Sequence, residues 1–195
     1  MPENWWQSDG WGGHRRVRRA SLLLALHILL FADPGSAMAL TLTSSAFAPG
    51  GKIPSTYTCE GDDLSPPLAF AGVPDGTKSL ALIVDDPDAP DPKAPKLVWV
   101  HWVVHNLPPE SKGLAENASV TGLPGAAVTG INDWKRTSYG GPCPPIGRHR
   151  YFHKLYALDI VLPVKPLTKS ALEATMKGHV LAQAELIGTY QKGDP

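Results

Sequence analysis

The sequence contains little cysteine, no apolar run long enough to cross a membrane and no excess of charge of either sign. Two cysteines among 195 residues are too few for a disulfide-rich scaffold. The apolar run at residues 20–31, interrupted only by Ser21 and His27, is shorter than the roughly 20 residues that span a bilayer. Lys plus Arg and Asp plus Glu number 18 each, and this balance argues against a nucleic-acid partner.

Common catalytic signatures are also missing. No G-x-S-x-G, H-E-x-x-H or C-x-x-C motif occurs, so the sequence indicates neither a serine-hydrolase elbow nor a zinc-protease helix. We therefore predict no cofactor and no bound metal, and we expect a binding protein rather than an enzyme.

The N-terminal segment has the pattern of a secretory signal peptide. Four arginines between Arg15 and Arg19 precede the apolar run, and a small-x-small site, residues 37–39, follows it. This predicts a signal peptide over residues 1–39, cleavage after Ala39 and a periplasmic or secreted protein. An uncleaved amphipathic anchor is the alternative.

Residues 40–195 fit one domain that is mainly β (α+β). Short apolar runs rich in β-branched residues alternate with Pro/Gly turns, which predicts an antiparallel β-sandwich. The clearest strands are predicted over residues 79–85, 98–106 and 151–162. Flanking helices are expected mostly at the C-terminus.

The C-terminal segment has the only helical period. Apolar residues recur near the 3.6-residue spacing, and Gly178 is expected to bend or divide the helix. Ser170 and Glu173 fit a capping box. The periodic positions are Leu172, Met176, Val180, Leu181 and Leu186.

Alternation along the strands predicts which side chains meet. Val98, Val100, Trp102 and Val104 are expected to share one apolar face that packs in the core. The other face would carry Trp99, His101, Val103 and His105, a combination that suits an apolar-walled pocket. In the third strand His149, Tyr151 and His153 fall together, opposite Arg150, Phe152 and Lys154.

Two loop motifs identify a family. Residues 86–90 (DPDAP) and 140–151 (GGPCPPIGRHRY) resemble the two signature blocks of the phosphatidylethanolamine-binding proteins (PEBP). Further matches favour the bacterial Raf-kinase-inhibitor-like (YbhB/YbcL) branch, and the similarity runs in order from about Leu42 to Tyr190. They are residues 57–61 (YTCEG), 65–68 (SPPL), 79–82 (SLAL), 101–102 (HW), 139–145 (YGGPCPP), 178–182 (GHVLA) and 188–190 (GTY).

The resemblance implies a β-sandwich with a small cavity for phosphate-like groups, including phospholipid headgroups. It suggests a secreted or periplasmic protein that binds phosphorylated or other small anionic ligands, with a kinase-inhibitor-like role by family analogy. The resemblance also allows a homodimer, in which the partner is a second copy of the chain. The ligand-binding residues carried over are Asp86, Asp88, Trp99, His101, Gly141, Pro142, His149 and Tyr151.

These residue types suit an anion. His101 and His149 can each donate an N–H, and Tyr151 offers a hydroxyl. The backbone N–H groups of Gly140 and Gly141 are expected to be open to an oxyanion. Asp86 or Asp88 would fix the tautomer of a histidine and make it a better donor.

Other readings stay open at this point. The same acids and histidines could serve a hydrolase or metal-assisted enzyme acting on a phosphoester. The pocket could also be vestigial, with the surface binding a protein partner. Cys59 and Cys143 either form a disulfide, as an oxidising compartment allows, or stay free and buried.

Overall fold

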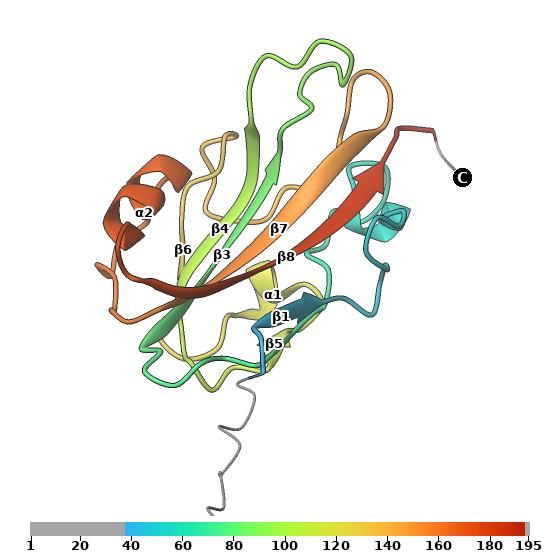
Figure 1. Ribbon diagram of the computed structural model, residues 1–195. Coiled ribbons are helices and arrows are strands. Elements are labelled where there is room, and N and C mark those ends of the chain that lie inside the picture. Colours follow the sequence, from blue (N-terminus) through green and yellow to red (C-terminus); the bar gives the residue numbers. More distant parts are fainter. Residues whose placement is uncertain (1–37, 194–195) are drawn as a thin grey trace, which may run out of the picture. The chain divides into compact units, whose positions relative to one another are not determined.

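Two antiparallel β-sheets make up most of the computed structural model, which describes residues 38–193 (Figure 1). Residues Ser36–Pro195 form one compact unit. The predicted mainly β class is therefore confirmed. The predicted signal peptide lies outside the described residues, apart from its last two positions.

The larger sheet has five strands and the smaller one has three. The larger has the order β6 (Val128–Thr129), β4 (Trp99–Leu107), β3 (Ser79–Asp86), β7 (His149–Leu158) and β8 (Val180–Tyr190). The smaller has the order β1 (Thr41–Thr43), β2 (Leu68–Ala71) and β5 (Gly113–Leu114). The short helices are η1 (Ser55–Tyr57), α1 (Ala118–Thr121) and α2 (Lys169–Met176).

Strand β3 is buried on both faces, which explains its nearly unbroken apolar sequence. Leu80, Leu82 and Val84 belong to the cluster that also contains residues of β1, β2 and β5. Ala81 and Ile83 belong to a second cluster, which includes Leu172 and Met176 of α2. The central strand therefore separates two cores, and α2 covers the second.

The predicted C-terminal helix is correct only over its first part. Helix α2 ends at Met176, and Val180–Tyr190 form strand β8 instead. Gly178 has φ +83°, which stops the helix, and from Ala182 onward the even-numbered residues turn to the core with period two. The capping box is also wrong, because the N-cap is Thr168, whose Oγ1 accepts a hydrogen bond from Ala171 N.

The expected apolar face of β4 is interrupted. The pairs Val84–Trp102 and Asp85–Val100 leave His101 without a partner on β3, so a β-bulge shifts the alternation there. Trp102 therefore joins the inter-sheet core, whereas Val100 joins the core beneath α2. Val98 also misses the core, since it is 45% exposed.

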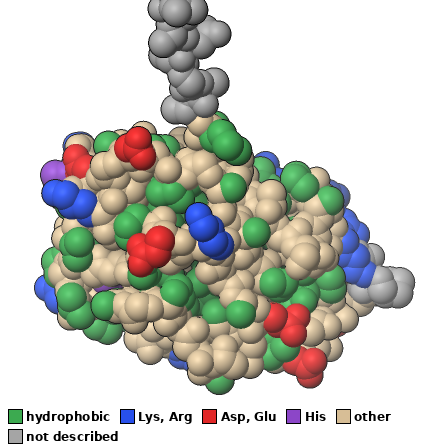
Figure 2. All heavy atoms as spheres, turned by 90° about the horizontal axis from the view of Figure 1, so that it is seen from below, with side chains coloured by type: hydrophobic (Ala, Val, Ile, Leu, Met, Phe, Trp, Pro, Cys, Tyr) green, Lys and Arg blue, Asp and Glu red, His purple; other side chains and the backbone are tan. Residues whose placement is uncertain are grey.

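The end of the unit that is seen from below shows acidic and basic side chains scattered singly among apolar and neutral ones (Figure 2). This end is opposite the β3–β4 loop, which lies at the top of Figure 1. The ionisable side chains that meet in a cavity lie instead near that loop.

Candidate functional site

The pocket lies where three neighbouring strands bring their polar ends together. In an antiparallel sheet the C-terminal end of β3 lies beside the N-terminal ends of β4 and β7. Asp86 pairs with Trp99, and Asp85 pairs with Phe152, so this register brings the sequence-distant polar residues to one place. They border a cavity of about 330 Å³.

The walls of this cavity are mostly apolar and its polar groups are few. Five predicted site residues line it: Asp86, Trp99, His101, His149 and Tyr151. The other lining residues are Ala89, Pro90, Leu97, Trp134, Cys143, Pro144 and Pro145. A small ligand would therefore meet a few directed polar groups inside an apolar enclosure.

Asp86 and His149 form a buried pair. Asp86 Oδ2 lies 2.7 Å from His149 Nδ1, and the two side chains are 5% and 0% exposed. His149 Nε2 lies 3.0 Å from the carbonyl oxygen of Ile146, so both ring nitrogens face acceptors. Only the imidazolium can donate to both. We therefore describe the pair as an ion pair without net charge, in which His149 has no free N–H for a ligand.

His101 presents a lone pair rather than a donor. Its Nδ1 lies 2.6 Å from Gly140 O and donates to it, because a carbonyl oxygen can only accept. Burial lowers the pKa of His101, because desolvation disfavours the charged ring. The ring is therefore neutral, and its buried Nε2, which has no protein partner, is an acceptor.

Tyr151 supplies the complementary donor. Its hydroxyl is buried without a protein partner, and the ring packs edge-on against His101 with centroids 5.1 Å apart. Burial raises the pKa of Tyr151 far above its ordinary range, so the hydroxyl keeps its proton. The residues of the pocket thus offer an unpaired acceptor, His101 Nε2, and an unpaired donor, the Tyr151 hydroxyl, on touching rings. Trp99 Nε1 is a second buried donor without a protein partner.

Asp88 does not line the cavity, although it was predicted as a site residue. Its carboxylate accepts hydrogen bonds from Arg150 N, Nε and Nη2 at 2.7–2.9 Å. The pKa of Asp88 is lowered chiefly by these side-chain hydrogen bonds. The carboxylate therefore anchors the 86–90 loop to β7.

Gly141 and Pro142 also lie outside the cavity lining. Gly141 N donates to Asp63 Oδ1 at 2.6 Å, and Gly140 N donates to His101 O at 3.2 Å. The expected open backbone donors are therefore already in use. A Cβ on Gly141 would lie 2.4 Å from Tyr57 O, so the glycine permits close contact between two chain segments.

Cys59 and Cys143 form a disulfide, with their Cα atoms 5.4 Å apart. Cys59 N also donates to Pro142 O at 3.1 Å. These bonds fasten the Pro-rich wall of the pocket to the loop after η1, and the disulfide alternative is confirmed.

Trp134 is the main wall residue that sequence reasoning missed. Its ring is edge-on to Trp99 and to His101, with centroids 5.3 and 5.1 Å apart. The loop is held by Asp133, whose Oδ2 accepts from Val100 N at 2.8 Å. A lone Trp in a polar loop was the available signal, but its position depends on these non-local bonds.

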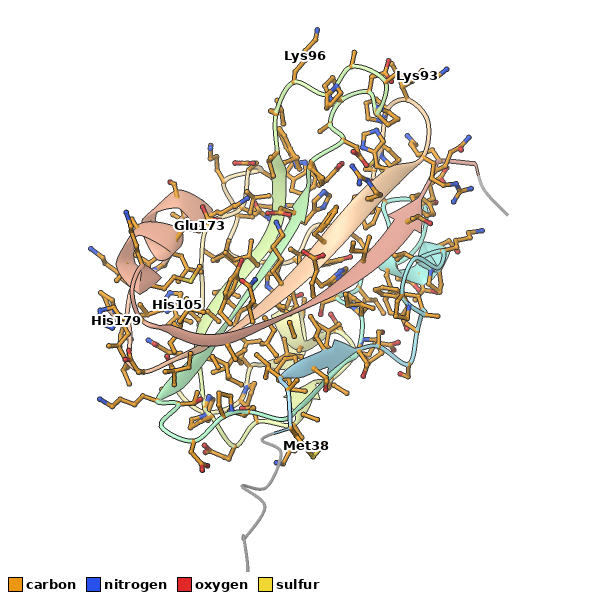
Figure 3. All side chains as sticks on the ribbon, in the orientation of Figure 1. Met38, Lys93, Lys96, His105, Glu173 and His179 are labelled. Atoms are coloured by element: carbon orange, nitrogen blue, oxygen red, sulfur yellow. A yellow bond between two sulfur atoms is a disulfide. The ribbon has the colours of Figure 1, made fainter. Side chains whose placement is uncertain are left out.

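Other histidines lie elsewhere. His105 lies near α2, far from Lys93 and Lys96 of the β3–β4 loop (Figure 3), and its Nε2 contacts Lys165 O at 3.1 Å.

Among residues 38–193 no three His, Cys, Asp or Glu side chains are grouped as metal ligands would be. Within the same residues, no helix has the length and apolar character needed to cross a membrane.

Known proteins match this chain over nearly all of the described unit. Residues 43–191 match the family model for phosphatidylethanolamine-binding protein. A UPF0098 protein of Methanothermobacter thermautotrophicus is 52% identical over 156 residues, covering 79% of this chain and 100% of the relative. A UPF0098 protein of Chlamydia muridarum is 47% identical over 154 residues, covering 78% of this chain and 99% of the relative.

Two solved structures show the same fold. A PEBP homolog of Chlamydia trachomatis is 46% identical and superposes with a TM-score of 0.73, covering 79% of this chain and 98% of its own. YbcL of E. coli, described as a member of the mammalian PEBP family, is 33% identical with a TM-score of 0.71, covering 79% and 99%.

Proposed function

We propose that this chain, which belongs to the phosphatidylethanolamine-binding protein family, binds a small phosphorylated or similar anionic ligand in the pocket at the ends of β3, β4 and β7. The observation that carries the proposal is that three residues lining the cavity each have a buried polar atom without a protein partner: His101 Nε2, Tyr151 OH and Trp99 Nε1. Buried polar atoms are nearly always paired, so a ligand that pairs them gains affinity.

The electrostatics favour a ligand that carries one proton. Tyr151 donates, and neutral His101 accepts, so the ligand must accept at one oxygen and donate from another. A singly protonated phosphomonoester does both. A fully ionised one has no proton to donate, so its oxygen and the His101 lone pair would be two acceptors facing each other. Sulfate carries no proton at neutral pH and should bind more weakly. Asp86 does not repel the anion as a lone carboxylate would, because His149 balances its charge.

The dimensions of the pocket favour a small headgroup. A volume of about 330 Å³ is near the lower end of the range for small-molecule sites. Leu97 and Trp134 line the pocket and are 47% and 36% exposed. The organic group of the ester would lie against these apolar side chains.

We also propose that the protein acts outside the cytoplasm. The signal-peptide pattern of residues 1–39 supports this location, and a disulfide is typical of an oxidising compartment. An exported protein would not meet a cytosolic kinase, so a kinase-inhibitor-like role rests on family analogy alone. The test expresses the full chain, residues 1–195, and looks for it in the periplasm or the medium. We expect to recover it there with residues 1–39 removed. Retention in the cytoplasm would contradict it.

The binding proposal is tested by a thermal-shift titration of residues 36–195, the compact unit. The ligands are phosphate, O-phosphoserine, phosphoethanolamine, a nucleotide and sulfate. A ligand at about 100 times its Kd stabilises the protein by roughly 2.7 kcal/mol. We expect stabilisation by the phospho-compounds but little by sulfate. Loss of ester during the titration would instead indicate a hydrolase.

Two histidine variants make the result specific. His149→Ala removes the buried pair with Asp86 and should abolish the shift. His179→Ala removes a similar pair with Asp159, at 2.8 Å, but both of those side chains are over 40% exposed. It should leave the ligand shift intact. An equal shift in both variants, or none in the folded parent protein, would refute the pocket as the binding site.

A further inference from the structure

Residues 143–146 carry two features of the pocket at once. The first three of them line the cavity. The carbonyl oxygen of Ile146 lies 3.0 Å from Nε2 of His149, and it is the acceptor that holds the second ring proton of that histidine. The position of this short segment therefore determines one wall of the cavity and the protonation of the buried pair that His149 forms with Asp86.

The disulfide between Cys59 and Cys143 fixes the start of this segment. The backbone before it is held by hydrogen bonds. Gly141 N donates to Asp63 Oδ1 at 2.6 Å. Pro142 O accepts from Cys59 N at 3.1 Å. Because both hydrogen bonds precede Cys143, they stay available when the disulfide is broken, whereas the wall beyond them loses its covalent anchor.

Both cysteines are exposed in the folded protein. A reductant in solution therefore reaches the bond without unfolding the chain. Exposed disulfides are among the labile and regulatory ones, whereas structural disulfides of secreted proteins resist reduction. The chain has two cysteines in all, so this bond is its one disulfide cross-link. It combines access from solvent with a place on the cavity wall, which Cys143 lines.

We propose that the Cys59–Cys143 disulfide is a redox switch for ligand binding in the pocket, a regulation that rests on the function proposed above. The oxidised form binds the ligand, and reduction by a small dithiol weakens the binding. In that step the bond between the two sulfurs breaks and each sulfur becomes a thiol. Two electrons and two protons come from the dithiol, whose own sulfurs join in a disulfide. The pocket would then bind its ligand in an oxidising compartment and release it in a reducing one.

Reduction weakens binding for two reasons. A wall that is no longer anchored must be ordered again when the ligand binds, and this ordering costs affinity. When the segment moves, Ile146 O also leaves Nε2 of His149, so the imidazolium loses one of its two acceptors. The neutral ring keeps an N–H toward Asp86 but no longer balances the carboxylate, which then repels an anion. Both effects act in the same direction.

The test compares the two redox forms of residues 36–195. This unit suffices because the Methanothermobacter relative matches it over 100% of its own length. Calorimetry measures the Kd of phosphoethanolamine for the oxidised protein and for the protein in excess dithiothreitol. We expect the Kd to rise about tenfold or more on reduction and to return after reoxidation. The double variant Cys59→Ser with Cys143→Ser should bind like the reduced protein, and dithiothreitol should not change its Kd further.

A second measurement needs no ligand. Nitrogen NMR of the histidine rings reports which ring nitrogens carry protons. On reduction the signals of His149 should change, because its acceptor on Ile146 moves. Those of His101 should stay as they are, because its acceptor on Gly140 is held by Gly140 N, which donates to His101 O at 3.2 Å. His101 is thus the internal control.

The two measurements separate the switch from the binding function. If phosphoethanolamine binds neither form, the binding function fails, and the His149 signals alone decide whether the disulfide controls the pocket. An unchanged Kd in a protein that binds the ligand would overturn the switch, and so would unchanged His149 signals. Unfolding on reduction, seen in the backbone amide spectrum, would also overturn it, because the bond would then be a structural tie.

Discussion

Asp85 and Asp86 are neighbours in β3, yet they belong to two different regions of the molecule. Asp85 is fully buried on the α2 side, where Lys154 Nζ and Lys169 Nζ lie 2.6–2.9 Å from its oxygens. Asp86 is buried on the pocket side, where it pairs with His149. Strand alternation turns the two carboxylates to opposite faces of one sheet.

The difference lies in what surrounds each carboxylate. Around Asp85 two cations satisfy one carboxylate and join β3, β7 and α2, so the group is structural. Around Asp86 the ion pair is closed, but His101 and Tyr151 beside it keep unpartnered polar atoms. A buried charge by itself is therefore poor evidence for function, whereas unpaired atoms on a cavity wall are better evidence.

The largest expected effect concerns the α2 side. Asp85→Asn leaves two lysines without their carboxylate, and we expect about 3 kcal/mol lower free energy of unfolding. This is the low end for a broken buried pair, because the lysine side chains are 26% and 19% exposed. Urea denaturation measures it. Ligand affinity of the folded variant should be unchanged, and a lost affinity would contradict the separation of the two faces.

The next effect is the pH dependence of phosphoethanolamine binding. Burial lowers the pKa of His101 and so keeps the ring neutral at neutral pH, which means that the shared proton must come with the ligand. A phosphomonoester loses its second proton near pH 6. Its Kd should therefore rise about tenfold per pH unit above that value. Calorimetry between pH 6 and 8 measures this slope, and a constant Kd would contradict the role assigned to His101.

The smallest expected effect is on ligand affinity, and it is measured by comparing variants of two tyrosines on β7. Tyr151→Phe removes one hydrogen-bond donor from the pocket and should weaken ligand binding by about tenfold, the value of one hydrogen bond to an anion. Tyr156→Phe changes the opposite face, where Tyr156 packs against the second core. It should leave binding unchanged. Equal losses in the two variants, measured by the same calorimetry, would mean that the effect is not local to the pocket.

Much of the fold could be predicted because its signals are local. The runs that became β3, β4 and β7 were found from β-branched residues and bounding turns. The helix predicted through strand β8 is wrong: Val180, Leu181 and Leu186 fit a helical spacing, but the residues from Ala182 onward also alternate with the period of a strand. The bulge at His101 could not be read, because it depends on how β4 pairs with β3.

The candidate site divides in the same way. Asp86, Trp99, His101, His149 and Tyr151 were predicted from the family motifs and from strand alternation, and they do line one cavity. Asp88 was placed there too, but Arg150 takes its carboxylate. Trp134 was missed, because the bonds that place its loop against β4 join residues about 30 positions apart.

The sequence by itself determined the family, the mainly β class, and the residue types that could meet an anion, because local patterns and ordered motifs carry that information. Only the tertiary structure decided which polar atoms remain unpaired. Hydrogen bonds across strands and loops consume Asp88, the backbone N–H groups of Gly140 and Gly141, and both nitrogens of His149. The polar atoms left for a ligand, His101 Nε2, Tyr151 OH and Trp99 Nε1, are known only after those non-local bonds have formed.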